Sequence, residues 1–391
     1  MTSEFLTPSD RAMPVPRAAG LVAVSMVKNE ADIIELFIRI NARVVDAFYV
    51  IDHNSDDGTP AILNALIREG FPIHLSRLAD MHYRPTENFT ALARDAARAH
   101  PGAYVVPLDA DEFLASETAD SPAQVIASRV EDDGWGQVPW RTYCMTSDRY
   151  FEQPAPLFHL FRARQQRGQE MSKVVLGNTF AQHCTLRRGN HSGYIEGVDC
   201  TPVALPLIIQ HAPIRSREQF LRKVITGTHI RALRGPRLGS ESFHYYDMID
   251  RLRAMEFEVG EQDLLDIALN YSTQPDQQSA LGLEEDGPRI GDATDVITMP
   301  ELAKVGLLTS LDKMLSGLVS MNLETREALK AATAELTRCL DHTRHERMHL
   351  EERLEAARQQ RDDALGVIDE LKASTSWRLT KPLRSLSRLL L

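Results

Sequence analysis

The stretch Val105-Val106-Pro107-Leu108-Asp109-Ala110-Asp111-Glu112 is the part of the sequence that decides the fold. An apolar run typical of a buried strand ends in two aspartates at positions i and i+2, which lie on the same face of an extended chain. Carboxylates that converge at a strand end bind hard cations such as Mg²⁺ or Mn²⁺, which are often shared with a nucleotide diphosphate. The alternative is an ordinary acidic loop, because Asp-x-Asp pairs are common.

The residues before this stretch repeat a pattern of buried strands and amphipathic helices. The expected strands are 20–26, 47–51, 72–76 and 103–108, and the expected helices are 31–44, 61–69 and 88–99. This alternation predicts an α/β fold with a mostly parallel sheet flanked by helices on both faces. The polar clusters Lys28-Asn29-Glu30, Asp52-His53-Asn54 and Asp109-Ala110-Asp111 each follow a predicted strand. Ligands bind beyond the carboxyl ends of such strands, so we expect a site there.

The rest of the chain changes character twice. Residues 135–255 carry short apolar runs among Gly, Pro and basic residues, which predicts an antiparallel or mixed extension of the sheet. Residues 322–372 are rich in Ala, Glu, Arg and Leu, which predicts a long helix. We therefore predict six parts: a disordered lead-in (1–19), the α/β domain (20–271), a flexible linker (272–295), a short helical connector (296–321), a long helix or coiled coil (322–372) and a basic amphipathic tail (373–391).

A heptad repeat fits the predicted long helix imperfectly. Its apolar a and d positions are Leu329, Leu336, Leu340, Leu350, Leu354, Ile368 and Leu371. Arg326, Arg347 and Arg361 also occupy a positions, which weakens a coiled-coil seam. A coiled coil would make the chain a homo-oligomer, and the alternative is a single solvated helix.

Composition and charge exclude several classes of protein. The net charge of −11 argues against a dedicated nucleic-acid binder. The 4 cysteines are scattered, so neither a zinc site nor a disulfide framework is expected, and a reducing cytoplasm fits best. No run of eighteen apolar residues suits a membrane span. The last residues, Ser376–Leu391, mix Arg, Lys, Trp and Leu, which predicts peripheral contact with the inner face of the cell membrane. The alternatives are docking on another protein, or disorder.

Three motifs in order resemble those of a known enzyme family. They are Val24-Ser25-Met26-Val27-Lys28-Asn29-Glu30, Asp52-His53-Asn54-Ser55-Asp56-Asp57-Gly58-Thr59 and Leu108-Asp109-Ala110-Asp111-Glu112-Phe113-Leu114. Together they resemble bacterial family-2-type glycosyltransferases of the GT-A fold, in particular the subgroup with Lys-Asn-Glu and Asp-x-Asp-Glu-Phe motifs. The later segment His211-Ala212-Pro213-Ile214-Arg215-Ser216 also resembles that subgroup, and the resemblance covers 20–235. The tail segment Ser374–Arg384 is similar to the ends of enzymes that make bacterial surface polysaccharides.

The resemblance implies a metal-dependent, hexosyltransferase-like enzyme. Such an enzyme moves a sugar, with inversion, from a nucleotide-diphosphate sugar to an acceptor hydroxyl on a glycan or lipid-linked molecule. Its cofactor would be Mn²⁺ or Mg²⁺, and its pathway would be the synthesis of a surface polysaccharide or glycoconjugate.

Individual roles follow from the resemblance and from side-chain chemistry. The metal ligands would come from Asp109, Asp111, His191 and His211, and nucleotide contacts from Glu30, Asp52, Asp109, Lys173 and Lys223. Alternatives remain: Asp52 as a turn cap, Glu30 as a helix-start acid, and either histidine as a structural residue. Glu112 either supports the metal site or faces away from it. Arg187, Arg188 and Arg215 are weaker candidates for diphosphate contacts.

The catalytic base has no clear signal. The usual Glu-Asp pair of the family is missing after the metal motif, and the nearest acids are Glu170, Glu196 and Asp199. A rival class is the nucleotidyltransferases, but the loop after the first strand has no glycine. A second rival is a non-catalytic coiled-coil scaffold with a degenerate nucleotide site. The intact Asp109, Asp111 and Asp52 argue against such degeneracy.

Overall fold

The computed structural model describes residues 20–78, 85–145, 161–165, 171–232, 243–269, 271, 283–284, 290–291, 295–304 and 306–375. The predicted lead-in (1–19) and most of the predicted tail (376–391) lie outside these residues, as does the candidate base Glu170. The chain divides into two compact units, Met1–Met314 and Leu315–Leu391. Each unit is described by itself.

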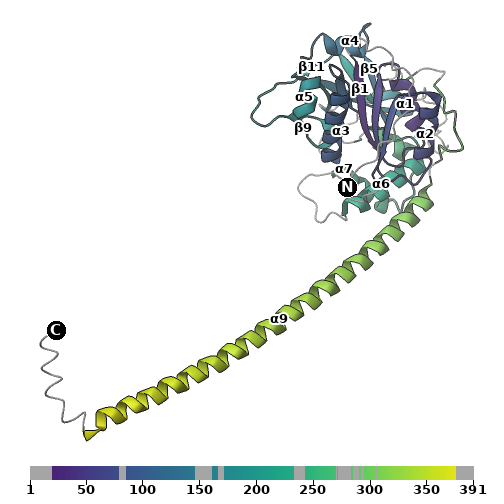
Figure 1. Ribbon diagram of the computed structural model, residues 1–391. Helices are drawn as coiled ribbons and strands as arrows, with labels where there is room; N and C mark the ends of the chain where they lie inside the picture. Colours follow the sequence, from purple (N-terminus) through teal and green to yellow (C-terminus); the bar gives the residue numbers. More distant parts are fainter. Residues whose placement is uncertain are drawn as a thin grey trace. The chain divides into compact units, whose positions relative to one another are not determined.

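Four parallel strands alternating with helices form the first part of the first unit (Figure 1). The strands are β1 (Leu21–Val27), β2 (Ala47–Asp52), β3 (Ile73–Arg77) and β4 (Tyr104–Pro107), and the helices are α1 (Ile34–Asn41), α2 (Thr59–Glu69) and α3 (Pro85–Ala99). In the sheet, β4, β1, β2 and β3 are neighbours in that order, and all three pairings are parallel. The predicted α/β fold, with a mostly parallel sheet between helices, is confirmed.

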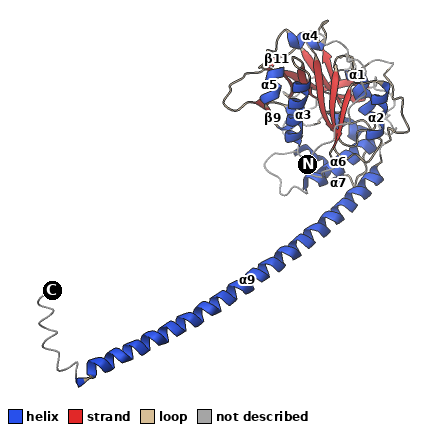
Figure 2. Cartoon of the chain, in the orientation of Figure 1, coloured by secondary structure: helices blue, strands red, loops and turns tan. Residues whose placement is uncertain are grey.

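Alternate side chains of β1 explain why helices cover both faces of the sheet. Leu21 and Ala23 pack in the same core cluster as the apolar residues of α1 and α2. Val22 and Val24 point the other way and pack with the cluster that contains the alanines of α3. Because both sets are buried, the strand reads as a continuous apolar run. Figure 2 shows these helices around the red strands.

Antiparallel strands extend the sheet beyond β4, as the less regular sequence predicted. The elements are β5 (Glu112–Ser116), α4 (Pro122–Ala127), β6 (Trp135–Met145), β7 (Phe161–Gln165), β8 (Ser172–Leu176), α5 (Asn178–His183), β9 (Thr185–Leu186), η3 (Arg188–Asn190), β10 (Gly193–Tyr194), β11 (Val203–Ala204), β12 (Leu207–His211) and β13 (Leu283–Glu284). Strand β8 lies antiparallel between β4 and β6. Strand β12 pairs with β5 and β6, and this pairing sets His211 opposite Glu112.

Three more helices and a return segment complete the first unit. The helices are α6 (Arg217–Ala232), α7 (Phe243–Ala254) and α8 (Glu261–Leu269). In the return segment, 295–304, the backbone N–H groups of Thr298 and Met299 donate to Glu35 Oε2 of α1 at 3.0 and 3.1 Å. The Leu302 carbonyl lies so close to Gly58 that a Cβ there would meet it at 1.9 Å. The return segment is therefore packed tightly on the helices that follow β1 and β2.

Residues beyond the predicted domain end at 271 also pack on the domain. Ile290, inside the predicted linker 272–295, is fully buried in the core. Asp295 is also buried, and its carboxylate pairs with Arg43 at 2.5 Å. The low apolar content of this stretch suggested a free linker, but a few well-placed side chains attach its described end to the domain.

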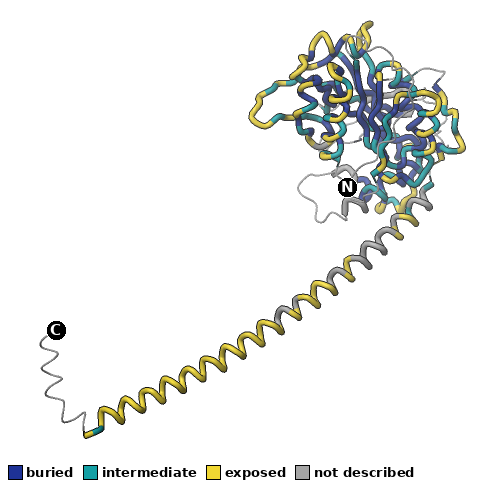
Figure 3. The backbone as a smooth tube through the Cα atoms, in the orientation of Figure 1, coloured by how far each residue is buried: buried dark blue, intermediate teal, exposed yellow. Residues whose placement is uncertain are grey.

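A single helix, α9 (Leu307–Ala373), follows the return segment. It begins fifteen residues before the predicted long helix, because the predicted connector 296–321 supplies its first turns instead of a separate helix. The prediction of a long C-terminal helix is confirmed. Most of its described side chains are exposed (Figure 3). Across the described residues, α9 and the other helices are all too polar or too short to span a membrane.

Candidate active site

The carboxyl ends of β1 and β4 define the place where a ligand would bind. The chain leaves β1 towards β2 on one side, and β4 returns to pair with β1 on the other side. Neighbouring strands whose connections run in opposite directions leave a crevice at their carboxyl ends. The predicted clusters Lys28–Glu30 and Asp109–Asp111 both follow these two strands.

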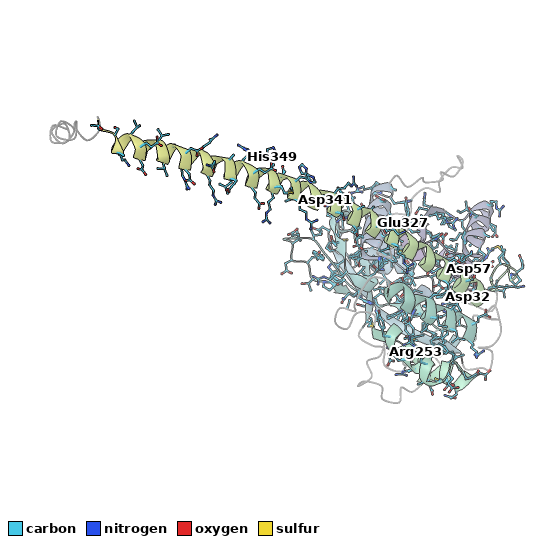
Figure 4. The ribbon with its side chains drawn as sticks, turned by 90° about the horizontal axis from the view of Figure 1, so that it is seen from below. Asp32, Asp57, Arg253, Glu327, Asp341 and His349 are labelled. Atoms are coloured by element: carbon cyan, nitrogen blue, oxygen red, sulfur yellow. The ribbon has the colours of Figure 1, made fainter. Side chains whose placement is uncertain are left out.

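The loops after β1 and β2 are fastened to each other by side-chain hydrogen bonds. The Asn29 N–H donates to Ser55 Oγ at 2.9 Å, and the Asp56 N–H donates to Asn29 Oδ1 at 2.8 Å. Arg222 of α6 donates to Asp57 at 3.0 Å and also to the carbonyl oxygen of Asn29. Asp57 is labelled in Figure 4 together with Asp32 of the first loop. The two loops thus form one rigid wall of the site.

Arg215 connects the acids of the two strand ends. Its guanidinium is fully buried and holds Asp32 in a two-pronged contact, with Nε–Oδ2 at 2.7 Å and Nη2–Oδ1 at 3.1 Å. It also donates to Glu30 at 2.6 Å and to Asp111 at 3.4 Å. Burial alone would lower the pKa of Arg215, but the three carboxylates raise it, so the guanidinium stays charged.

Asp111 contacts two cations, Arg215 and Lys223, and also lies close to His211. Lys223 Nζ donates to Asp111 Oδ2 at 2.8 Å, and His211 Nε2 lies 3.6 Å from Oδ1. Burial would raise its pKa, but the positive charges of Lys223 and Arg215 hold the pKa of Asp111 well below its usual range. Burial lowers the pKa of His211, against the pull of Asp111, so the imidazole is neutral near pH 7. The structure thus joins three predicted residues, Asp111, His211 and Lys223.

A second ion-pair group lies beside the first one. Lys173 of β8 is 1% exposed, and its ammonium lies 2.8 Å from Asp109 and 3.1 Å from Glu112. Glu112 also accepts a hydrogen bond from the Asp109 N–H at 2.9 Å. Glu112 therefore supports the turn that carries Asp109 and does not face away. Burial, opposed by Lys173, raises the pKa of Glu112 to about 8.

The two groups together contain more carboxyl groups than cations. Five carboxyl groups, those of Glu30, Asp32, Asp109, Asp111 and Glu112, contact three cations, Lys173, Arg215 and Lys223. Burial also raises the pKa of Glu30 to about 7, against Arg215 and Lys223. Glu30 and Glu112 are therefore partly protonated near pH 7, and a divalent cation bound at the cluster would favour their ionised forms.

Two other predicted residues have local partners. Asp52 Oδ1 accepts from the Ser55 N–H at 3.0 Å, which is the turn-capping role, and Oδ2 lies 3.6 Å from Arg77. His191 Nδ1 lies 2.7 Å from the Ser172 carbonyl oxygen. Burial, together with the charge of Lys173, lowers the pKa of His191.

Two of the three candidate bases, Glu196 and Asp199, make no contact with the described residues of the acidic cluster. Glu196 and Asp199 are exposed in the turn around the Ile195–Val198 bridge. Neither forms an ion pair or hydrogen bond with any residue that the structure describes. Glu170 lies outside the described residues.

Sequence reasoning missed Asp32 and underrated Arg215. Asp32 is separated from Arg215 by 183 positions, and a lone pair at that distance leaves no periodic signal. A weak signal existed: Glu30 and Asp32 repeat the i, i+2 spacing of Asp109 and Asp111 after a neighbouring strand.

Asp111 and His211 are the residues that fit a divalent cation. One is an ionised carboxylate and the other a neutral imidazole, and both types ligate Mn²⁺. Among the described residues, no three His, Cys, Asp or Glu side chains group closely enough to hold a metal alone. The protein would therefore supply few ligands, as is usual where phosphate oxygens and water complete the coordination.

Comparisons with known proteins add little to this geometry. No protein-family model and no curated protein sequence matches the chain. Among solved structures, it is similar to TarS 1–349 from S. aureus, at 11% identity and a TM-score of 0.30, over 64% of this chain and 81% of the other. It is also similar to the mannosyltransferase PcManGT from Pyrobaculum calidifontis in complex with GDP-Man and Mn²⁺, at 17% identity and a TM-score of 0.30, over 60% and 69%.

A third similar structure covers less of the chain. Glucosyl-3-phosphoglycerate synthase from Mycobacterium tuberculosis, in complex with Mn²⁺, UDP and glucosyl-3-phosphoglycerate, has 18% identity and a TM-score of 0.21 over 31% of this chain and 44% of the other. At these TM-scores the likenesses carry no argument about function, which rests on the site itself.

Proposed function

We propose that this chain is a metal-dependent glycosyltransferase of the GT-A type that uses a nucleotide-diphosphate sugar as its donor. The observation that carries the proposal is the cluster at the β1/β4 crevice, where five carboxylates face three cations. An anionic diphosphate would be repelled by the ionised carboxylates of this cluster unless a divalent cation entered with it. Metal-dependent binding of a nucleotide diphosphate is what such a site can do.

The residue roles follow the contacts. Asp111 and His211 would hold Mn²⁺ or Mg²⁺, which would neutralise the diphosphate as the leaving group. Lys223 is already at Asp111 and would meet the same phosphate oxygens. Asp109, whose side chain is 47% exposed, is open to the metal or to a ribose hydroxyl, and Lys173 fixes its other oxygen.

The remaining roles are proposed from the sequence resemblance. Glu30, in the loop after β1, and Asp52, the last residue of β2, would contact the nucleoside. His191 is a weaker metal ligand than His211, because Ser172 already engages its Nδ1. The acceptor hydroxyl would attack the anomeric carbon from the side opposite the diphosphate and lose its proton to a carboxylate, which inverts the configuration. Glu170, Glu196 and Asp199 stay the candidates for that base.

The acceptor and the setting are inferred from the second unit and the tail. We propose a glycan or lipid-linked acceptor in surface polysaccharide synthesis, at the inner face of a cell membrane. The exposed residues Leu350, Leu354, Ile368 and Leu371 of α9 lie on the predicted heptad seam, and this supports a homo-oligomer through a coiled coil. Analytical ultracentrifugation of the full chain and of Leu354→Glu/Ile368→Glu tests this, because only a coiled coil would dissociate. An unchanged sedimentation mass contradicts it.

Thermal stability with nucleotides tests the enzyme assignment. UDP, GDP and their glucose and mannose esters are added with Mn²⁺ or with EDTA, because a ligand that binds only the folded state raises the Tm. We expect a rise that needs both nucleotide and Mn²⁺ and that is lost in Asp111→Asn. The control is Asp341→Asn on α9, an exposed aspartate labelled in Figure 4.

The outcome also separates the rival function. A shift that is equal with and without Mn²⁺, or that persists in Asp111→Asn, contradicts the metal-dependent site. No shift with any nucleotide favours the scaffold, for which the long exposed helix is the supporting observation.

A further inference from the structure

Four aromatic rings gather in one cluster, and one of them belongs to His211, which lies beside Asp111. They are Trp140 of β6, His211 of β12, Tyr271 and His191, and we call them the Trp140 cluster. The Trp140 and His211 ring centroids are 4.1 Å apart, and Tyr271 is 5.3 Å from His211 and 6.5 Å from Trp140. His191 lies 6.1 Å from Trp140. Trp140 is therefore the centre of the group.

The Trp140 cluster borders the candidate active site. His211 belongs to both, because its Nε2 faces Asp111 at 3.6 Å. Tyr271 and Lys223 line a small hollow whose other walls are apolar. Trp140 and Ile209 are register partners in the β6–β12 pair, so the strand that carries His211 also places the indole. A group bound at the cluster would lie next to the bond that the proposed reaction breaks.

Two buried polar atoms of the cluster have no hydrogen-bond partner among the residues that the structure describes. They are Trp140 Nε1 and His211 Nδ1. Buried polar atoms in folded proteins nearly always have a partner, and each exception needs an explanation. The other tryptophan of the same strand shows the usual case, since Trp135 Nε1 donates to the Cys200 carbonyl oxygen at 3.2 Å.

A saccharide has the chemistry that both features require. Its hydroxyl groups donate and accept, so one hydroxyl can satisfy the indole N–H and another can satisfy either tautomer of His211. Its C–H face is apolar and packs on an aromatic ring. Sites with aromatic walls and a few converging polar groups are the usual form of small-molecule pockets.

We propose that the Trp140 cluster is a saccharide-binding subsite, with Trp140 as the platform and the indole N–H as a hydrogen-bond donor to a sugar hydroxyl. The proposal rests on the proposed function for its place in the reaction, but not for the binding itself. Two sources fit the same chemistry: the sugar of the donor nucleotide, and a sugar of the acceptor.

Saturation-transfer NMR on the full chain separates these sources. The probes are UDP-glucose, GDP-mannose, methyl glucoside and methyl mannoside, with Mg²⁺ in place of Mn²⁺ so that the lines stay narrow. The variants are Trp140→Phe, which keeps a ring but removes the N–H, and Trp140→Ala, which removes the platform. The matched control is Trp135→Phe, the same change five residues earlier in β6. Thermal melts establish which variants are folded.

We expect Trp140→Phe to weaken sugar binding by about threefold and Trp140→Ala by about tenfold, the size of one hydrogen bond and of that bond plus stacking. Trp135→Phe should leave it unchanged. If the Trp140 variants lose saturation transfer to the sugar of the nucleotide-sugar but keep it to the nucleotide, the sugar of the donor occupies the subsite. If the methyl glycosides lose theirs while the nucleotide-sugars keep all contacts, the acceptor occupies it.

Other results overturn one idea or the other. Unchanged sugar contacts in a folded Trp140→Phe variant, or no sugar contact with any probe in the wild-type chain, overturn the subsite. Methyl glycoside binding that depends on Trp140, with no nucleotide contact at all, keeps the subsite and overturns the glycosyltransferase.

Discussion

Two ion pairs of nearly equal length occupy opposite environments in this molecule. In the domain, Arg215 and Asp32 lie 2.7 Å apart, and their side chains are 0% and 2% exposed. On α9, Arg347 and Glu351 lie 2.8 Å apart, and theirs are 79% and 60% exposed. The distances are alike, but water can solvate a charge of the exposed pair that loses its partner, whereas it cannot reach the buried pair. Length therefore says little about what an ion pair does, and burial says much more.

The strongest test of this contrast is Arg215→Met. The change leaves Asp32 and Glu30 buried beside no guanidinium, so we expect the free energy of unfolding to fall by about 3–5 kcal/mol. Urea denaturation measures it. Arg217→Met, two residues along and 35% exposed at its side chain, should cost far less. If both variants lost the same free energy of unfolding, the buried position of Arg215 would have no special effect on stability.

Lys173→Met should have a smaller effect on the same scale. Glu112 would lose its ammonium partner but can protonate, because burial already raises its pKa to about 8. We expect a loss of about 1–3 kcal/mol. The double variant Lys173→Met/Glu112→Gln should recover part of it, which a double-mutant cycle detects. A strictly additive cycle would show that the pair is not coupled.

Fold and site differed in how much the sequence alone could predict. The sheet was predictable because β1, β2 and β4 are nearly continuous apolar runs bounded by polar turns. Asp109 and Asp111 were predictable because they follow such a run directly. The sequence did not predict Arg215 at the centre of the ion pairs or Trp140 at the centre of the aromatic cluster. Their partners are far away in the chain, and neither residue belongs to a periodic pattern. The return segment 295–304 was missed because it forms neither helix nor strand, so its packed residues Ile297, Met299 and Leu302 follow no periodic pattern.

A histidine pair away from the site gives a modest pH effect. His74 and His100 flank Tyr49, with ring centroids 4.4 and 5.7 Å from it. Burial lowers the pKa of both histidines. The unfolded chain then binds protons more readily below its pKa of 6.5, so stability is complete above that pH and falls as the solution becomes more acidic.

The measurement is the Tm between pH 7.5 and 5.5. His74→Phe keeps a ring stacked on Tyr49 but cannot titrate, so its Tm should fall less over this range than that of the wild-type chain. His342→Phe on α9, at an exposed position, serves as the control. A variant with the same pH slope as the wild type would exclude His74 as a source of the effect.

The smallest expected effect belongs to the exposed pair. Arg347→Ala should leave the melting of the helix signal at 222 nm unchanged to within about 1 °C, because exposed pairs contribute little. Circular dichroism checks this at low and at physiological salt. A large loss of helix would mean that the pair is buried in solution. Packing of α9 against another helix would bury it in this way.

The return segment has a consequence for the order in which the domain can be made. Strand β1 is synthesised long before the return segment, yet Glu35, just after it, accepts hydrogen bonds from the backbone of Thr298 and Met299. The nascent chain can pair β1 to β4 early, but these contacts form only after residue 299 has been made. A truncated chain that stops at residue 271 would remain at this stage, with Glu35 lacking those donors and the core lacking Ile290.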